Sequence, residues 1–340
     1  MQAPFGTILN MATLHTVTLP TGTGTSRNYE CSEGETILQA GLRAGLPLRY
    51  KCLNGSCGEC KSQLLEGQIT SLRPHDFSLS SQAQQAGWFL SCTHAPASNI
   101  QLSAPLFGSV QQVPHQTIQC KVKKITILPD GMAILTLKTP RSNTFQFLAG
   151  QSVTLSHLLV EKRYPIASCP CNGGELEFHI PQRAEDPFSQ LLFSSLKRGE
   201  RVTIEGPYGQ FSLDEASKRP LVFIAWEHGF APVRSLVDHL ISLEMENPVS
   251  LYRIARNAPY LNNHAKAWHA ILEPFDDHWI SYSSAQWDEP MAELLNTMRQ
   301  RLEIRNCDFY IAAPAPFLIA LSEQLLDIGV KEEQLHAAPL

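Results

Sequence analysis

The chain has 340 residues, of which 43% are hydrophobic and 17% charged, and its formal net charge is −5. The length predicts two or three domains with apolar cores. The negative charge argues against nucleic-acid binding. No run approaches the roughly 18 consecutive apolar residues of a membrane span. The start, "MQAPFGTILN", lacks the basic stretch and apolar run of a signal peptide, so a soluble cytoplasmic protein is expected.

Charge is spread unevenly along the chain. Residues 11–103 hold six Lys/Arg and six Asp/Glu, and residues 116–214 hold eleven and nine. Residues 215–340 hold ten Lys/Arg and seventeen Asp/Glu. The last third is therefore the acidic part of the protein.

The first segment predicts a small α+β domain over residues 11–103, and Met11 offers an alternative start. Residues 14–31 alternate as two strands around a Gly/Thr turn, which indicates a hairpin. Apolar residues at helical spacing follow over 35–46 and end at Gly45. Further short strands are expected at 62–69, 87–92 and 99–104. This order suits a β-grasp domain.

Three cysteines lie close together in "KCLNGSCGEC", at Cys52, Cys57 and Cys60, and 31 residues separate Cys60 from Cys92. The spacing C-x4-C-x2-C…C is that of plant-type [2Fe–2S] ferredoxins. Gly55 and Gly58 let the loop take positive φ and bring backbone N–H groups to sulfur. The four cysteines are therefore the expected ligands of a [2Fe–2S] cluster.

A disulfide framework and a structural zinc site are the two alternative uses of these thiols. A disulfide framework is disfavoured because the total of nine cysteines is odd and no signal peptide precedes them. Structural zinc sites usually pair two short C-x2-C units, and only one is present. Cys31, Cys120, Cys169, Cys171 and Cys307 show no ligand spacing, so we expect small buried side chains or inert thiols there.

A Pro/Gly/Gln-rich stretch at 104–115 is expected to be a linker, and two segments with different patterns of apolar residues follow it. Short strands separated by turn signals predict a small antiparallel β-barrel over 116–214. From residue 215, short apolar runs alternate with helical segments, which predicts an α/β domain with a parallel sheet over 215–340.

A cysteine loop, an antiparallel barrel and an α/β domain in this order resemble the ferredoxin–NAD(P)H reductase superfamily. The closest resemblance is to reductases in which a plant-type ferredoxin precedes the flavin domain. Such proteins serve phenol- and methane-type monooxygenases and some sugar-deoxygenating enzymes. The resemblance implies an FAD-binding barrel, an NAD(P)-binding-like last domain and an oxygenase or other redox partner.

"KRYPIAS" is similar to the family's flavin signature R-x-Y-[ST]-x-x-S, with a lysine in place of the arginine. A lysine is a point charge and not a bidentate fork. Ser189 matches the family's phosphate motif G-x-x-S, but Asp186 stands in place of its glycine. The resemblance implies FAD rather than FMN. The flavin-binding candidates that it implies are Lys162, Arg163, Tyr164, Pro165, Ser168, His179, Phe188 and Ser189.

The last domain departs from the family where it should bind a nicotinamide nucleotide. Trp226, Glu227 and His228 stand in place of the glycine-rich G-G-T, and Ala312 and Ala313 replace the Cys and Gly of C-G-P. The turn normally lets a pyrophosphate approach backbone N–H groups at a helix start. Departures at places that serve one ligand predict an altered or lost nucleotide site.

Two functions follow from these expectations. In the first, the protein passes electrons from NAD(P)H through FAD and a [2Fe–2S] cluster to a partner protein, usually an oxygenase. In the second, the last domain has lost nicotinamide binding and serves as a docking or regulatory module.

Overall fold

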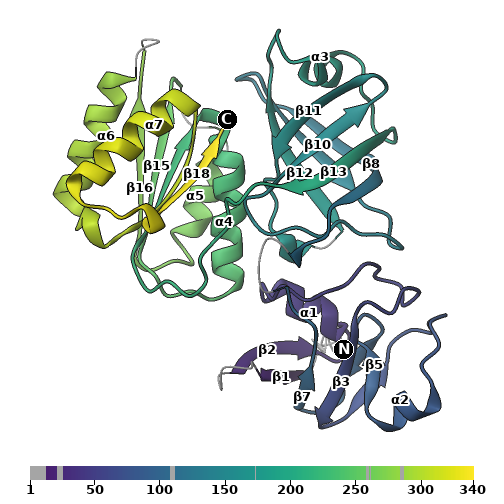
Figure 1. The fold of residues 1–340 in the computed structure, drawn as a ribbon. Helices are drawn as coiled ribbons and strands as arrows, with labels where there is room; N and C mark the ends of the chain where they lie inside the picture. Colours follow the sequence, from purple (N-terminus) through teal and green to yellow (C-terminus); the bar gives the residue numbers. More distant parts are fainter. Residues whose placement is uncertain are drawn as a thin grey trace, which may run out of the picture. The chain divides into compact units, whose positions relative to one another are not determined.

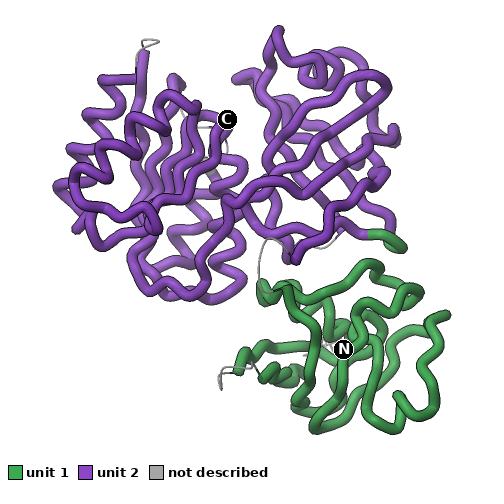
Figure 2. Tube along the Cα trace, viewed as in Figure 1, with its two compact units in different colours: residues 1–107, 141–143 green, residues 108–140, 144–340 purple. Residues whose placement is uncertain are grey.

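The computed structural model describes residues 13–20, 26–107, 112–172, 174–257, 260, 262–283 and 287–340. The chain divides into two compact units, one of residues 1–107 with 141–143, the other of 108–140 with 144–340 (Figure 2). Met11, the Gly/Thr turn at 22–25 and part of the predicted linker, 108–111, lie outside the described residues. In the described part, no helix is both long and apolar enough to cross a membrane.

The first unit is a mixed sheet against a short helix (Figure 1). Its five-stranded sheet has the order β2-β1-β7-β3-β5, and β4 pairs with β6 separately. The predicted hairpin is confirmed, with Leu14 opposite Ser32 and Pro20 opposite Ser26. The elements are β1 (Leu14–Pro20), β2 (Ser26–Ser32), α1 (Ile37–Arg43), β3 (Lys61–Glu66), β4 (Ile69–Ser71), α2 (Ser81–Gln85), β5 (Trp88–Leu90), β6 (His94–Pro96) and β7 (Ile100–Ser103).

Helix α1 begins where the sequence predicts it. The Thr36 side chain accepts a hydrogen bond from the Gln39 N–H, which caps the first turn. Its apolar face, Ile37, Leu38 and Leu42, joins strand residues in one buried core. This core supports the cysteine segment between α1 and β3.

The second unit contains an antiparallel sheet and a parallel sheet. The antiparallel sheet has six strands in the order β11-β10-β13-β8-β9-β12. Its elements are β8 (Gln116–Ile127), β9 (Met132–Lys138), β10 (Ser152–His157), β11 (Val160–Pro165), η2 (Pro170–Asn172), β12 (Glu175–Pro181), α3 (Pro187–Ser194) and β13 (Arg201–Tyr208). Strand β11 and helix α3 were not among the predicted elements.

The predicted parallel α/β arrangement of the last third is confirmed, in the order β16-β15-β14-β17-β18. Strand β18 was not predicted. The elements are β14 (Leu221–Trp226), η3 (Glu227–Gly229), α4 (Phe230–Ser242), β15 (Val249–Ala255), α5 (Asn262–Trp268), β16 (Phe275–Ser281), α6 (Asp288–Arg301), η4 (Ile304–Asn306), β17 (Asp308–Ala313), α7 (Ala315–Ile328), η5 (Glu332–Gln334) and β18 (Leu335–Pro339).

Strand β14 is buried on both faces, as the centre of a parallel sheet should be. Phe223 and its neighbours on one face share a core with α4 and α5. Val222 and Ile224, on the other face, share a core with α6 and α7. The end of β14 and the start of α4 therefore form the turn where a nucleotide would be expected.

Candidate functional site: a cysteine loop, a flavin strand and an altered turn

The cysteine loop lies directly before β3, and Cys92 follows β5. Gly55 and Gly58 both have φ of 78°. A Cβ at Gly55 would lie 2.5 Å from the Cβ of His75, and one at Gly58 would lie 2.3 Å from the Phe77 ring. The predicted glycine conformations are confirmed, because both the φ angle and the close packing exclude a side chain.

The four thiols form two contacting pairs. Cys52 shares a hydrogen bond with Cys57, and Cys60 shares one with Cys92. All four are free cysteines, so none is used in a disulfide. Among the described residues, no three His, Cys, Asp or Glu side chains converge as ligands of a single metal ion. Two pairs of thiols fit a cluster with two irons better than one tetrahedral zinc.

Backbone N–H groups point at the sulfurs, as the loop was expected to allow. The Glu59 N–H lies 3.5 Å from the Cys57 Sγ. Burial raises the pKa of Cys52, but hydrogen bonds from Cys57, from the backbone and from Ser56 outweigh it and lower the pKa to about 6. The hydrogen bond from Cys92 lowers the pKa of Cys60 against its burial. In each pair the partner, Cys57 or Cys92, has a raised pKa, Cys57 chiefly through burial and Cys92 through its hydrogen bond to Cys60. Each pair therefore favours one thiolate, the form that binds iron, held by one thiol.

The flavin signature lies on β11 at the edge of the antiparallel sheet. Lys162 and Arg163 are exposed, and the Arg163 guanidinium lies 3.9 Å from the centre of the Tyr208 ring. Tyr164 is buried, and its hydroxyl donates to the Asp186 Oδ2 at 2.6 Å. Ser168 accepts a hydrogen bond from the Glu177 N–H. The cations of this strand thus face solvent, while its tyrosine faces the core.

Asp186, noted in the sequence only as a departure, is the N-cap of α3. Its Oδ1 accepts from the Ser189 N–H at 3.0 Å. Ser189 is fully buried, and its hydroxyl donates to the Pro181 carbonyl. The Phe188 ring lies 5.7 Å from that of Tyr164. The structure therefore gathers three of the predicted flavin residues around one carboxylate. The Asp-Pro pair before a helix was the signal that could have revealed this cap.

His179 lies apart from that group. Its Nε2 is 3.0 Å from the Glu177 Oε1, and its Nδ1 is 3.2 Å from the Tyr260 hydroxyl. Arg234 of α4 pairs with the same Glu177. Burial lowers the pKa of His179. Burial raises the pKa of Glu177, but His179 and Arg234 together lower it to about 2. The network joins the antiparallel sheet to α4 through a half-buried charge pair.

These residues fit an FAD pyrophosphate in part. Lys162 is an exposed cation with no ion-pair partner in the described part of the chain, which suits a phosphate. The start of α3, where backbone N–H groups would bind an anion, already holds the Asp186 carboxylate. A phosphate at that helix start would meet a like charge.

We therefore expect Lys162→Gln and Asp186→Asn to change FAD affinity in opposite directions. Loss of the cation should weaken FAD binding by roughly tenfold. Asn keeps one oxygen to accept from the Ser189 N–H, and its NH2 group can donate to the Tyr164 hydroxyl. Because the charge is removed, FAD binding should tighten. Titration of the apoprotein with FAD, followed by fluorescence quenching, measures both effects.

Two matched variants control for general effects. Lys138→Gln removes an exposed lysine from β9, and Asp130→Asn changes a carboxylate that also accepts a backbone N–H in the same sheet. If each site variant bound FAD with the same affinity as its control, Lys162 and Asp186 would lie away from the FAD phosphates.

The turn after β14 is filled by its own side chains. The Trp226 ring lies 4.6 Å from the ring of Tyr282 and 4.8 Å from that of Phe317. Glu227 has φ of 47°, in the region that favours glycine. Its Oε1 accepts from the Arg256 N–H and from the Tyr282 hydroxyl, both at 3.0 Å. An indole and a carboxylate therefore occupy a position where the family has a bare glycine turn.

The rest of this turn is equally close-packed. A Cβ at Gly229 would lie 2.3 Å from the Ala312 carbonyl oxygen, so glycine is required there. Ala312 and Ala313 are fully buried and offer no thiol. The chain end lies nearby, since the Leu340 N–H donates to the Ala313 carbonyl. The two departures seen in the sequence therefore meet in one place, beside the last residue.

His228 lies against Arg183, with its Nδ1 3.4 Å from the guanidinium Nη2. Burial, with the positive charge of Arg183, lowers the pKa of His228 to about 4. The unfolded chain therefore binds this proton more readily than the folded chain below a pH of about 6.5. The stability that the neutral ring contributes is lost as the pH falls from about 6.5 towards 4.

We expect His228→Gln to reduce the acid sensitivity of folding. Between pH 7.5 and pH 5, the free energy of unfolding of the parent should fall by about 2 kcal/mol more than that of the variant. At pH 5 the His228 imidazole is protonated in the unfolded parent but must lose its proton on folding, and the variant has no such group. Urea unfolding at the two pH values measures the difference. His269→Gln, at an exposed histidine of the same domain, should keep the parent's pH dependence. Equal pH dependence in the parent and His228→Gln would show that His228 contributes nothing to it.

The expectation that the remaining cysteines are inert is wrong for two of them. Cys169 and Cys171 form a disulfide with Cα atoms 5.2 Å apart. That separation lies within the ordinary range for a disulfide, so one intervening residue suffices. Cys31, Cys120 and Cys307 are buried free thiols, as expected.

Comparison with known proteins agrees with these features. Residues 21–97 match the 2Fe-2S iron-sulfur cluster binding domain, and residues 119–213 match the oxidoreductase FAD-binding domain. The CDP-6-deoxy-L-threo-D-glycero-4-hexulose-3-dehydrase reductase of Yersinia pestis is 33% identical over 217 residues, which are 64% of this chain and 65% of the relative. Reductase component 1 of terephthalate 1,2-dioxygenase from Comamonas is 30% identical over 250 residues, 73% of this chain and 74% of the relative.

Solved structures show the same fold over nearly the whole chain. A cytochrome P450 reductase of Amycolatopsis has a TM-score of 0.60 at 20% identity, covering 96% of this chain and 98% of its own. The ferredoxin reductase in carbazole 1,9a-dioxygenase has a TM-score of 0.58 at 24% identity, covering 96% and 99%.

A cluster-binding domain followed by an FAD-binding domain defines an iron–sulfur flavoprotein, whose cofactors are a [2Fe–2S] cluster and FAD. The chain belongs to the family of ferredoxin-first reductases that includes reductase components of oxygenases. The chain spans about 65% of the length of the Yersinia reductases that it matches.

Proposed function

We propose that this protein is an NAD(P)H-dependent electron-transfer reductase that delivers electrons to a partner protein, an oxygenase component. Bound FAD accepts an electron pair and the bound cluster passes single electrons. The two thiol pairs carry this proposal, because they suit a two-iron cluster. Relatives named as reductase components of terephthalate dioxygenase and phenol monooxygenase support the choice of an oxygenase as acceptor.

Each part of the chain has a role in this proposal. Residues 11–103 form the ferredoxin domain, with Cys52, Cys57, Cys60 and Cys92 as cluster ligands, and residues 104–115 form a linker. Residues 116–214 form the FAD-binding barrel, in which Lys162 binds the FAD phosphates. Residues 215–340 form an NAD(P)-binding-like domain. The remaining FAD-binding residues in this proposal are Arg163, Tyr164, Pro165, Ser168, His179, Phe188 and Ser189.

A second function is favoured by the filled turn. The Trp226 ring and the Glu227 carboxylate fill the turn at which a nucleotide is expected, which supports a last domain that serves as a docking or regulatory module while the cofactors move electrons between protein partners. Its acidic composition, seventeen Asp/Glu against ten Lys/Arg over 215–340, also disfavours a dinucleotide.

Anaerobic mixing of the holoprotein with NADH and with NADPH separates the two functions. Loss of flavin absorbance, followed by reduction of the cluster, supports the reductase. If neither nucleotide bleaches the flavin, but the chemically reduced protein still reduces a one-electron acceptor such as cytochrome c, the second function is supported. Failure of both reactions would refute an electron-transfer role.

A further inference from the structure

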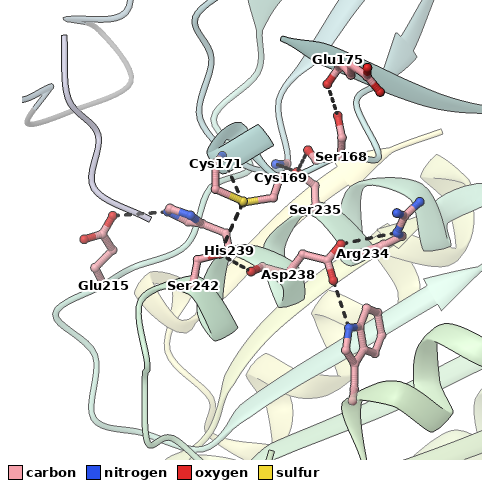
Figure 3. The surroundings of a disulfide bond; sticks show 12 residues. Ser168, Cys169, Cys171, Glu175, Glu215, Arg234, Ser235, Asp238, His239 and Ser242 are labelled. Carbon is pink, nitrogen blue, oxygen red and sulfur yellow. Dashed lines mark hydrogen bonds and ion pairs between the residues drawn. A yellow bond between two sulfur atoms is a disulfide. The ribbon is translucent and has the colours of Figure 1, made fainter. Parts of the chain in front are cut away.

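One disulfide lies apart from the cysteines that are expected to bind the cluster. Cys169 and Cys171 follow the flavin-signature strand directly, and the disulfide between them packs against helix α4 (Figure 3). Neither the cluster nor the proposed FAD contacts require this bond. The other seven cysteines are free thiols.

A stabilising role is a poor explanation for this bond. A disulfide stabilises mainly by closing a loop in the unfolded chain, and the gain grows with loop length. Here the two cysteines are separated by only two positions in the sequence. The constraint on the unfolded chain is therefore among the smallest that a disulfide can impose.

Hydrogen-bond donors are placed at both sulfurs. The Cys171 N–H lies 3.2 Å from the Cys169 Sγ. The Ser242 hydroxyl lies 3.4 Å from the Cys171 Sγ and 3.8 Å from the Cys169 Sγ. A donor on sulfur stabilises a thiolate more than a disulfide, because the charged sulfur is the stronger acceptor. The surroundings therefore favour the reduced pair.

Ser242 has one hydroxyl proton and two acceptors. Besides the Cys171 Sγ, its hydroxyl lies 2.9 Å from the Asp238 carbonyl oxygen, one turn earlier in α4. The carbonyl is the stronger acceptor while the disulfide is intact. After reduction, a thiolate competes for the same proton. The hydroxyl can thus follow the redox state by rotation alone.

The two sulfurs differ in access. Cys169 is buried, whereas Cys171 is half-buried. An incoming thiolate can therefore attack the Cys171 Sγ, and the Cys169 sulfur leaves with the Cys171 N–H as its donor. His239, one helical turn before Ser242, is buried, and its Nδ1 has no hydrogen-bond partner within the described residues.

We propose that Cys169 and Cys171 form a thiol–disulfide exchange site for dithiol partners. The partner's first thiolate attacks Cys171 and breaks the S–S bond, which gives a mixed disulfide and a Cys169 thiolate. The partner's second thiolate then displaces Cys171. The partner leaves as a disulfide, and Cys169 and Cys171 become two thiols. Two electrons and two protons pass from the partner to this chain.

Equilibration with dithiothreitol tests the proposal. The full chain with its cofactors is held anaerobically at varied ratios of reduced to oxidised dithiothreitol. Free thiols are then alkylated, and the peptide with Cys169 and Cys171 is quantified by mass spectrometry. We expect both cysteines to become labelled together. A tenfold change in the dithiothreitol ratio should change the ratio of dithiol to disulfide about tenfold, as a two-electron exchange requires.

Ser242→Ala should need a dithiothreitol ratio roughly tenfold more reducing to reach half reduction, because the thiolate loses a donor. Ser194→Ala is the matched control, since Ser194 makes the same hydroxyl-to-carbonyl bond within α3 and touches no sulfur. A bond that never forms would overturn the proposal, as would one that is reduced only after unfolding. Equal shifts in Ser242→Ala and Ser194→Ala would also overturn it.

Discussion

Replacing Cys60 or Cys92 with serine is expected to abolish the [2Fe–2S] cluster. Holoprotein should contain about two irons and two labile sulfides per chain. The two residues are a contacting, buried pair, so loss of either thiolate removes half of the ligands on one side. A serine side chain has nearly the volume of cysteine, but its hydroxyl does not ionise near neutral pH and so does not replace the thiolate. Iron content and visible absorbance should fall close to zero, and Cys52→Ser and Cys57→Ser should disturb the other pair.

Cys31→Ser is the matched control for these variants. Cys31 is also fully buried in the first unit, but its thiol donates only to the backbone carbonyls of Ser32 and Glu35. A serine hydroxyl can make the same bonds, so iron content should be unchanged, as it should be in Cys120→Ser. Zinc without labile sulfide after anaerobic preparation would contradict the cluster, as would equal loss of iron in Cys31→Ser.

NADH and NADPH are expected to bleach the flavin slowly in the unmodified protein. The Glu227 carboxylate places a negative charge where a pyrophosphate would lie, and the Trp226 ring fills the same turn. The repulsion between this carboxylate and a pyrophosphate amounts to a few kcal/mol at most after screening, so nucleotide binding should be weakened and not abolished. Replacing Trp226, Glu227 and His228 with Gly, Gly and Thr should speed the reaction, incompletely because Ala312 still lacks a thiol.

Glu227→Gly is the sharper single test. Removal of Trp226 empties a packed site and costs about 3 kcal/mol or more. Glycine at position 227 instead suits the φ of 47°. It removes the charge together with the acceptor of the Arg256 N–H and the Tyr282 hydroxyl, but it empties no packed apolar site. Flavin reduction at low nucleotide concentration should become roughly tenfold faster, which corresponds to about 1.4 kcal/mol of binding. Stopped-flow absorbance at the flavin band measures it.

Glu244→Gly controls for the backbone effect, because Glu244 also has a positive φ, of 52°, and is exposed at the end of α4. It should leave the rate unchanged. Rapid bleaching of the unmodified protein at micromolar nucleotide would refute the expectation and restore an ordinary reductase.

Local patterns predicted the parts of this chain that local physics determines. The C-x4-C-x2-C spacing and two glycines sufficed for the loop, because its ligands lie within nine residues. The alternation of buried strands with helices predicted the parallel sheet, because each strand and each helix shows its own pattern of apolar residues within a short segment. Strand β11 was missed because "VEKRYP" carries exposed charges and little apolar alternation, as an edge strand does.

Contacts between distant residues could not be predicted in this way. Asp186 looked like an intrusion into a phosphate motif. Its Asp-Pro pair signals the cap of α3, but its bond to the distant Tyr164 hydroxyl could be found only in the structure. The place of Trp226 between Tyr282 and Phe317 joins three separate parts of the chain. The disulfide was missed because Cys169 and Cys171 were judged by ligand spacing, whereas the decisive quantity is the distance between their Cα atoms.

Helix α4 gives two of these features a common mechanical support. Its thirteen residues make a stiff rod about 20 Å long. The altered turn of Trp226–His228 leads into its first residue, and Ser242, which touches the disulfide, is its last. Between them, Ser235 holds the Ser168 carbonyl. The turn and the sulfur pair are therefore attached to the two ends of one continuous helix, which fixes the spacing between them.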